Sequence, residues 1–330
     1  MRIKMVYLQS MSRLIDDIGT FLEANGFDFS FQIRDDFDVI YVNTLDGKRA
    51  GIILPLEIKA SSPGEARLAS LAARSCINCI SVLEGYPIII PEDRWNRQRK
   101  MMETRLLAHL ELFSQAYARN CEVRRIDKET ANRFLAANHS YGYAACRYRY
   151  GLFLKRHTGH IAEEIRELRN SSRDAASSSH SERSEDSLPY DLIAVATFSN
   201  ARKWIKDGKE IRSYEWTRYA SLPDMRVSGG MGKLLKAFIK EVQPDDIMSY
   251  ADLEWSEGRV YKTLGFKEEL TKEPVLFEID PQTWERTPIR PGKAETEDGM
   301  EEKMTGSSAD HFYYRNFGSR KLRLKLTEYR

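Results

Sequence analysis

Cysteine is scarce in this sequence. Its 330 residues include four, Cys76, Cys79, Cys121 and Cys146, too few for a disulfide framework in a chain of this length. Cys76 and Cys79 form one C-x-x-C pair, but a structural zinc site needs four ligands, and no second Cys or His pair stands at a matching spacing. We therefore expect these cysteines to be small apolar residues on a buried helix.

Long apolar runs and a strong charge of one sign are also lacking. No run approaches the roughly 18 apolar residues that a membrane helix needs, and no apolar block with a cleavage site begins the chain. The net charge of +2 neither demands nor excludes a nucleic-acid partner, because a local patch matters more than the total. We expect a soluble globular protein, since 42% hydrophobic and 30% charged residues are typical of that class. The lack of apolar runs predicts no membrane partner, and the few cysteines fit the reducing cytoplasm.

The length predicts two domains, because one hydrophobic core rarely serves 330 residues. We expect a small α/β domain over 1–94, a linking helix over 95–120 and a second domain over 121–330. Two stretches inside the second domain, 159–188 and 291–310, are charged and nearly free of large apolar residues. Such stretches cannot offset their own ordering entropy, so we expect them to be disordered insertions.

Strand-like segments flank both insertions. CRYRYGLFLKR precedes the first and YDLIAVATFSN follows it, whereas PVLFEID precedes the second and SRKLRLKLTEY follows it. We expect two β-hairpins with long turns, because long surface insertions cost little free energy.

The first domain alternates helical and strand-like segments. Met11–Ala24 has apolar residues at helical spacing and ends at Asn25-Gly26. FDVIYVN, GIILPLEIK and YPIIIP are short apolar runs that fit buried strands, and GEARLASLAARSCINCISVLEG between the last two fits a helix.

The segment MRVSGGMGKLLKAFIKEV, residues 225–242, places three glycines between a strand and a helix. SYEWTRYASLP before it is rich in strand-forming residues, and the apolar residues after the glycines form one helical stripe: Leu234, Leu235, Phe238, Ile239 and Val242. This order aims free backbone N–H groups at one point, with the helix dipole behind them. A pyrophosphate would fit there, and so would tight packing alone.

These residues and a later motif resemble the GNAT superfamily of acyl-CoA-dependent N-acyltransferases. Its [Q/R]-x-x-G-x-[G/A] pattern matches Arg226, Gly229 and Met231, and its Y-x-x-x-G-F motif matches Tyr261 to Phe266. The resemblance implies an α+β second domain with a mixed central sheet flanked by helices. It also implies acetyl-CoA or another acyl-CoA as donor and an amine of unknown identity as acceptor.

The resemblance implies site residues as well. Tyr261 would protonate the departing thiolate, and Glu215 on the preceding strand would act as the base. A glutamate works as a base near neutral pH when burial raises its pKa. The coenzyme A pyrophosphate would lie on the backbone amides of the glycine turn: Arg226, Val227, Ser228, Gly229, Gly230, Met231 and Gly232.

One departure from the pattern puts the phosphate site in doubt. Met231 stands where the family has a small residue, and Gly232 comes one place late. Each residue also has a structural alternative. Glu215 can be an ion-pair partner of Arg218 or another basic neighbour, Tyr261 a packed aromatic, and Arg226 a solvated turn residue.

A narrower resemblance covers roughly 88–270. FLAANHSYG, SYEWTRYAS, RVSGGMGKLLKAFI and SYADLEWSEGRVYKTLGF look like a group of phage and mobile-element proteins, often labelled homing-endonuclease-like, that pair a GNAT-like half with a nuclease-like half. It implies a DNA-associated setting, with nucleic acid as a possible partner. His139 would then orient or deprotonate the amine, unless Asn138-His139 only caps its own helix.

The first domain also contains a nuclease-like pattern. Asp38, followed by Glu57-x-Lys59, resembles the PD-(D/E)xK nucleases. Alternation on a strand puts Glu57 and Lys59 on one face, where Asp38 and Glu57 could hold Mg²⁺. The alternative is an edge strand with polar residues in water, and Pro55 favours an edge or irregular strand.

The sequence therefore favours acyl-CoA-dependent N-acyl transfer. The alternative is a Mg²⁺-dependent nuclease or nucleic-acid-binding protein with a non-catalytic GNAT-like domain. A binding module with neither activity is a third possibility.

Overall fold

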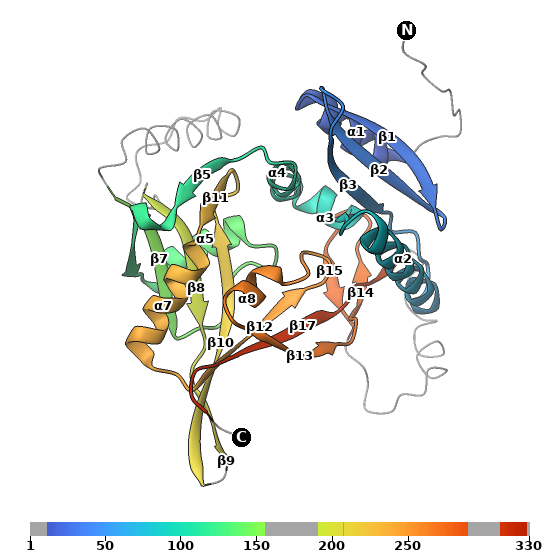
Figure 1. The fold of residues 1–330 in the computed structure, drawn as a ribbon. Helices are drawn as coiled ribbons and strands as arrows, with labels where there is room; N and C mark the ends of the chain where they lie inside the picture. The colour runs from blue at the N-terminus through green and yellow to red at the C-terminus, as the bar shows by residue number, and fades with distance from the viewer. Residues whose placement is uncertain (1–11, 156–190, 207, 290–310, 329–330) are drawn as a thin grey trace. The chain divides into compact units, whose positions relative to one another are not determined.

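The protein is a mixed α/β protein with several sheets (Figure 1). A computed structural model describes residues 12–155, 191–206, 208–289 and 311–328. The insertions expected over 159–188 and 291–310 lie outside these residues. The chain divides into two compact units that are not contiguous in sequence. The first unit holds 1–111, 252–257 and 271–319, and the second holds 112–251, 258–270 and 320–330.

A four-stranded sheet of order β1-β2-β3-β4 forms the centre of the first unit. The first three strands are antiparallel, and β3 runs parallel to β4 through a crossover helix. In chain order the elements are α1 (Arg13–Ala24), β1 (Phe27–Arg34), β2 (Phe37–Thr44), β3 (Arg49–Leu56), α2 (Pro63–Leu83), β4 (Ile88–Pro91), α3 (Glu92–Arg97) and α4 (Arg99–His109).

Alternation of side chains along the strands builds a three-layer core in this unit. Ile40 and Val42 on β2 pack with residues of α1, α3 and α4. Val39 and Tyr41, one position away, pack with α2 on the opposite face. Both long helices begin at a serine cap, as Ser12 accepts from Ile15 N and Ser62 from Glu65 N.

The predicted helices and strands of the first domain are present, but β1 was missed, and β3 ends at Leu56, so Glu57 and Lys59 follow the strand and do not lie on it as expected. Pro55 was expected to mark an edge or irregular strand, and this holds only locally. β3 lies between β2 and β4, and Pro55 comes after Ile53, the last residue of β3 that pairs with β2. Its missing N–H therefore interrupts no bond of that ladder.

The expected hairpin between PVLFEID and SRKLRLKLTEY is also wrong. β14 (Leu276–Ile279) pairs instead with β15 (Arg286–Pro288) and β16 (Phe312–Arg315) in a small sheet of the first unit. β16 packs on α2, and Ala60 forms an isolated bridge with Tyr313. The described residues between 271 and 319 thus belong to the first unit.

An eight-stranded sheet dominates the second unit. Its order is β13-β17-β12-β10-β8-β7-β6, with β9 paired to β10. The elements are β5 (Ser114–Tyr117), β6 (Cys121–Arg125), α5 (Lys128–Asn138), β7 (Tyr148–Leu154), β8 (Leu192–Phe198), β9 (Arg202–Lys206), β10 (Lys209–Ser221), β11 (Met225–Ser228), α7 (Gly230–Val242), β12 (Asp246–Asp252), α8 (Arg259–Thr263), β13 (Lys267–Lys272) and β17 (Ser319–Lys325).

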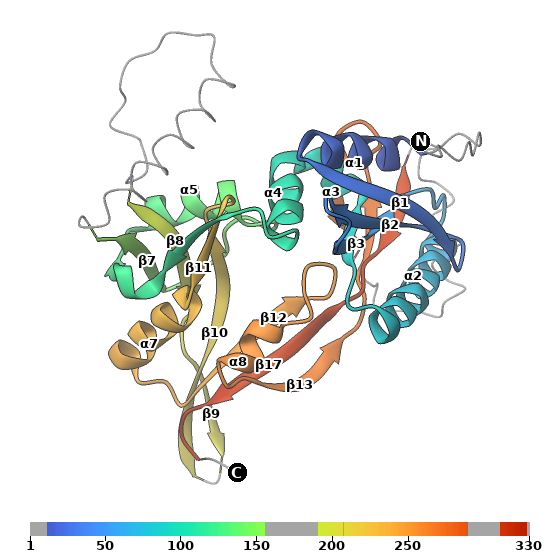
Figure 2. The ribbon, with the colours of Figure 1, turned by 45° about the horizontal axis from the view of Figure 1, so that its top comes forward.

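Two helices cover opposite faces of this sheet (Figures 1 and 2). Leu234 and Phe238 of α7 pack with Tyr150 on β7 and its same-face neighbours. Phe134 and Leu135 of α5 pack with the other face. The hairpin expected across the first insertion is present, since β7 and β8 are antiparallel partners.

The expected linking helix and the expected burial of both Cys76 and Cys79 need correction. The linking helix expected over 95–120 is interrupted at Gln98, ends at His109, and is followed by β5 and a short 3₁₀ turn, Ala118–Asn120. Among the described residues, one helix, α2, has the length and hydropathy of a membrane span, with 33% of that window buried. Its Cys76 is fully buried, and burial raises the pKa of that thiol to about 11, whereas Cys79 is exposed.

Candidate active site

The parallel strands β10 and β12 stay together for only three residue pairs. Ser213, Tyr214 and Glu215 lie opposite Asp246, Ile247 and Met248, and the pairing ends there. Both strands continue, β10 to Ser221 and β12 to Asp252. Backbone groups beyond Glu215 are therefore left without a strand partner on that side, and such groups need other partners.

Glu215 stands at the point where the two strands part. Its backbone is fixed by Ser199, whose Oγ accepts from Glu215 N at 2.9 Å and whose N donates to Glu215 O at 2.9 Å. Its mostly buried carboxylate pairs with Arg202 at 3.5 Å, so the expected ion pair is present, with a basic neighbour other than Arg218. Because the Arg202 side chain is 67% exposed, this pair is weak and leaves the carboxylate available.

Tyr261 on α8 lies near the point where β10 and β12 separate, across from Glu215. Ser249 Oγ on β12 lies 3.1 Å from the Tyr261 hydroxyl oxygen and 3.1 Å from Trp216 O on β10. The Tyr261 ring packs edge-on against Trp216 and Phe266. Burial raises its pKa, although Ser249 and Arg218 act in the opposite direction. The phenol thus keeps its proton at neutral pH and can donate it.

A β-bulge in β10 brings Arg218 to the site, a residue that the sequence suggested only as an ion-pair partner. Trp216 pairs with Phe198 and Arg218 with Thr197, so Thr217 is the extra residue. In a regular strand residues 215 and 218 would point to opposite faces. The bulge resets the alternation, and Arg218 shares the α5 face with Glu215. Its guanidinium interacts electrostatically with Glu215 and with the phenols of Tyr141 and Tyr261.

His139 ends α5 beside this face. Its Nδ1 accepts from Tyr141 N at 3.1 Å, and its carbonyl accepts from Gly142 N at 2.7 Å. The side chain of Asn138 bonds back to Phe134 O. These bonds match the capping alternative, but the loop they form also reaches the site, since Arg218 Nε donates to Gly142 O at 3.1 Å.

The glycine turn precedes α7 as the sequence predicts. Gly229 has φ +76°, a conformation that side chains rarely adopt, and no side chain caps the helix. The N–H groups of Gly230, Met231 and Gly232 lie in the first turn, where helices have no internal acceptor. Lys233 is turned away, because its Nζ donates to Ala118 O and Cys121 O.

The structure explains why Met231 is tolerated next to glycines. A Cβ on Gly230 would lie 2.9 Å from Val227, and one on Gly232 would lie 3.2 Å from Leu264, so both glycines serve packing. Met231 is half-buried and packs against the core under α7. Its side chain therefore fills the core side of the turn.

The remaining residues of the turn lie on its outer edge. Arg226 is exposed, with its guanidinium 5.4 Å from the centre of the Phe113 ring. Gln115 Nε2 donates to Ser228 Oγ at 3.2 Å. Both contacts join β11 to its parallel neighbour β5 and set the direction from which the chain enters α7.

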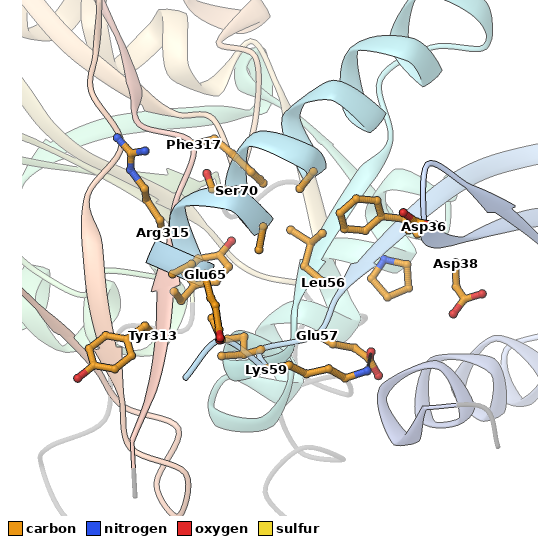
Figure 3. Close-up of a pocket in the computed structure, with 18 of the residues that line it drawn as sticks. Asp36, Asp38, Leu56, Glu57, Lys59, Glu65, Ser70, Tyr313, Arg315 and Phe317 are labelled. Carbon is orange, nitrogen blue, oxygen red and sulfur yellow. Dashed lines mark ion pairs between the residues drawn. The ribbon is translucent and has the colours of Figure 1, made fainter. Parts of the chain in front are cut away.

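A second candidate site lies in the first unit, where Asp38, Glu57 and Lys59 line one cavity of about 400 Å³ (Figure 3). Asp38 lies two residues before Ile40 on β2, so alternation points it to the α1 face. Lys59 is exposed and forms an ion pair with Glu57. Glu92 accepts from Ile58 N at 2.8 Å, and burial, with repulsion from Glu57, raises its pKa.

The donor set for a metal ion is small. Among residues 12–155, 191–206, 208–289 and 311–328, no group of three or more His, Cys, Asp or Glu side chains could hold one. Asp38 and Glu57 could still suffice for Mg²⁺, which usually keeps several waters and takes one or two carboxylates.

Comparisons with known proteins give partial structural likenesses. No protein-family model matches the chain, and a search among curated proteins gives no significant match. Among solved structures, it is similar to a conserved protein of unknown function from Enterococcus faecalis V583, described as a probable N-acyltransferase. The identity is 14%, the TM-score 0.29, and the match covers 55% of this chain but only 41% of that protein's length.

It is also similar to a mutant of the AtaT toxin bound to the C-terminus of the antitoxin AtaR and to acetyl-CoA. The identity is 10%, the TM-score 0.25, and the match covers 59% of this chain and 93% of that one. With TM-scores below 0.5, neither likeness by itself assigns a fold or an activity. Neither description concerns a mobile-element or DNA-associated protein.

Proposed function

We propose that the second unit is a GNAT-type N-acyltransferase that takes its acyl group from acetyl-CoA or another acyl-CoA. The observation that carries the proposal is the position of Glu215 and Tyr261 on either side of the point where β10 and β12 separate. Beyond Glu215, β10 has no β12 partner; the carbonyls of Trp216 and Thr217 already accept from side chains, and the remaining backbone groups on that side would pair with the amide-containing arm of coenzyme A. The glycine turn of α7 offers its free N–H groups to the pyrophosphate.

In this proposal the acyl-CoA and the amine bind on opposite faces of the sheet. The acyl-CoA lies on the α7 side, with Ser228, Gly229 and the first turn of α7 around its phosphates. The amine approaches from the α5 side, where Glu215 lies. It attacks the thioester carbonyl carbon through the gap between the strands, so that both reactants are held in one geometry.

Proton transfer completes the reaction. Glu215, directly or through a water, takes a proton from the attacking nitrogen as the C–N bond forms. The C–S bond then breaks, and Tyr261 gives its proton to the departing thiolate. The raised pKa of Tyr261 keeps that proton in place until the thiolate appears. His139 supports the loop of the acceptor side rather than serving as the base.

The test is turnover by the full chain with acetyl-CoA and a panel of amines, followed as release of free coenzyme A thiol. Tyr261→Phe and Glu215→Gln should each lower kcat by about 10²- to 10⁴-fold, the usual range for positioned acid–base groups. Tyr150→Phe is the matched control, because it also removes a hydrogen-bonded hydroxyl from this core. Full turnover by both site variants would overturn the proposed roles.

A second candidate function belongs to the first unit. The sharing of one cavity by Asp38, Glu57 and Lys59 favours a Mg²⁺-dependent nuclease of PD-(D/E)xK type. Asp38 and Glu57 would hold the metal, which would supply an activated water and charge neutralisation at a phosphate. Lys59 is already paired with Glu57 and would have to leave it to reach a phosphate.

Cleavage of single- and double-stranded DNA with Mg²⁺ tests this candidate. Glu57→Ala should abolish cleavage, whereas Asp46→Ala, on an exposed turn of the same unit, should leave it unchanged. No cleavage by the unaltered chain, or full cleavage by Glu57→Ala, would exclude it.

A further inference from the structure

The α5 face of the eight-stranded sheet carries two arginines in one row. Arg149 on β7 lies opposite Thr197 on β8, and Thr197 lies opposite Arg218 on β10. Neighbouring strands are about 4.8 Å apart, so the two arginines are separated by the width of one intervening strand. Tyr148 and Tyr150 pack toward α7, which places Arg149 on the α5 face.

Both guanidinium groups are anchored to the loop that follows α5. Arg218 donates from Nε to Gly142 O at 3.1 Å and from Nη1 to Thr217 O at 2.8 Å. Arg149 donates from Nη2 to Cys146 O at 3.0 Å. Backbone carbonyls thus fix the direction of two side chains that would otherwise move freely, which prepares their remaining N–H groups for a planar anion.

Some of that donor capacity is unused within the described part of the chain. Arg149 Nε is buried and has no hydrogen-bond partner there. Arg218 Nη2 makes no hydrogen bond among the described residues, but this atom is accessible to solvent and not buried. Native proteins rarely leave buried donors unsatisfied, so Arg149 Nε needs a partner, and an anion bound beside it would supply one.

The charges on this face also lack balance. Glu215 is the carboxylate that interacts with Arg218, and it is shared with Arg202. Arg202 and Arg218 therefore share this one carboxylate. The pyrophosphate of coenzyme A cannot supply the missing charge, because the glycine turn begins α7, which covers the opposite face.

We infer that Arg149 and Arg218 form a subsite for an anionic group, a carboxylate or a phosphate, carried by the acceptor amine. The acceptor is then a molecule such as an amino acid or a phosphorylated amine, and Arg218 determines that specificity. The identity of the bound molecule as an acceptor rests on the proposed function. Anion binding at the subsite does not.

Matched probes that differ only in charge test the inference. We would measure binding of N-acetylglycine, N-acetylglycinamide and N-acetylphosphoethanolamine to the full chain by calorimetry, with and without coenzyme A. At least one anionic probe should bind about 10- to 100-fold more tightly than the neutral amide, the range expected for hydrogen bonds to a charged group. The stronger of the two identifies the group as carboxylate or phosphate.

Substitutions then show which arginine causes the tighter binding of the anionic probe. Arg218→Gln should remove it and Arg149→Gln should reduce it, whereas Arg218→Lys, which keeps the charge, should retain part of it. Arg147→Gln, at an exposed position of the same segment, is the control and should keep it all. Equal binding of charged and neutral probes to the unaltered chain, or a preference that survives both Gln variants, would overturn the inference.

The outcome is separate from that of the proposed function. If acetyl-CoA does not bind but the anion preference is present, the acyltransferase proposal fails and the subsite stands. If acetyl-CoA binds and the preference is absent, the subsite alone fails.

Discussion

Ser249 Oγ lies 3.1 Å from the phenolic oxygen of Tyr261. The same hydroxyl lies 3.1 Å from Trp216 O, so it joins α8 to both of the diverging strands. The contact holds the proposed acid at the point where the thiolate would leave.

Ser249→Ala should therefore impair catalysis more than binding. We expect kcat to fall about 10-fold, because Tyr261 loses the partner that orients it, with KM for acetyl-CoA changed less than 3-fold. Steady-state kinetics with saturating amine provide the measurement. An equal loss for Ser199→Ala, which touches Glu215 through the backbone only, would show that the effect is not specific to Tyr261.

Met231→Ala separates the two explanations for the methionine in the glycine turn. Because Met231 packs toward the core, shortening it should leave the affinity for acetyl-CoA within about 3-fold and lower the unfolding free energy by about 1 kcal/mol or more. Calorimetric titration and urea unfolding measure the two quantities. A tenfold gain in affinity would mean that the methionine obstructs the phosphate site.

The first unit depends on a buried carboxylate. Glu254 is 1% exposed, accepts from Arg286 Nη1 at 2.8 Å and from the Tyr314 hydroxyl, and pairs with Arg94 at 3.3 Å. Glu254→Gln would leave Arg286 with Asp93 and Arg94 with Asp252 as their remaining acidic partners, so it should destabilise this unit by about 1–3 kcal/mol. Urea unfolding, followed by tryptophan fluorescence, measures this loss.

Glu285→Gln is the control for that substitution, because its pair with Arg97 is exposed and should matter little. Burial alone would raise the pKa of Glu254, but Arg286 and Arg94 outweigh it and hold the pKa below its usual value. Its contribution is therefore present above the unfolded-state pKa of about 4.3 and is lost as the pH falls below it. Stability of the first unit that is unchanged between pH 6 and pH 3 would contradict this assignment.

Alkaline pH should weaken the second unit through its partly buried tyrosines. Burial raises the pKa of both Tyr219 and Tyr261. Groups whose pKa is higher in the folded state contribute stability below the unfolded-state value of about 10, and this stability is lost as the pH rises past it. Unfolding free energies between pH 8 and 11 should decline less steeply for Tyr219→Phe. The exposed Tyr143→Phe should follow the unaltered chain.

Local patterns in the sequence predicted much of the fold. Periodicity identified α1, α2 and α7, and apolar runs identified β2, β3 and β4. β1 was missed although FDFSFQIR alternates strictly between apolar and polar residues, which is the pattern of a half-buried strand. The strand partner of PVLFEID could not be predicted from the local sequence. That partner, β16, lies beyond an insertion, and nothing in either segment specifies the pairing.

The candidate site was only partly predictable. Glu215, Tyr261 and the glycine turn came from a family resemblance, and they remain proposals in their roles. Arg149 and Arg218 were not recognised as a pair, because they meet only through the register of β7, β8 and β10. The bulge that turns Arg218 toward Glu215 has no sequence signature of its own.

Binding of acetyl-CoA is the most direct test of the central claim. We would compare calorimetric titrations of the unaltered chain, Gly229→Asp and Gly208→Asp. Both glycines have positive φ in the second unit, but only Gly229 begins α7, where a carboxylate would repel a pyrophosphate. The account predicts measurable binding that is lost in Gly229→Asp and kept in Gly208→Asp. No binding to the unaltered chain, or equal binding to all three proteins, would contradict it.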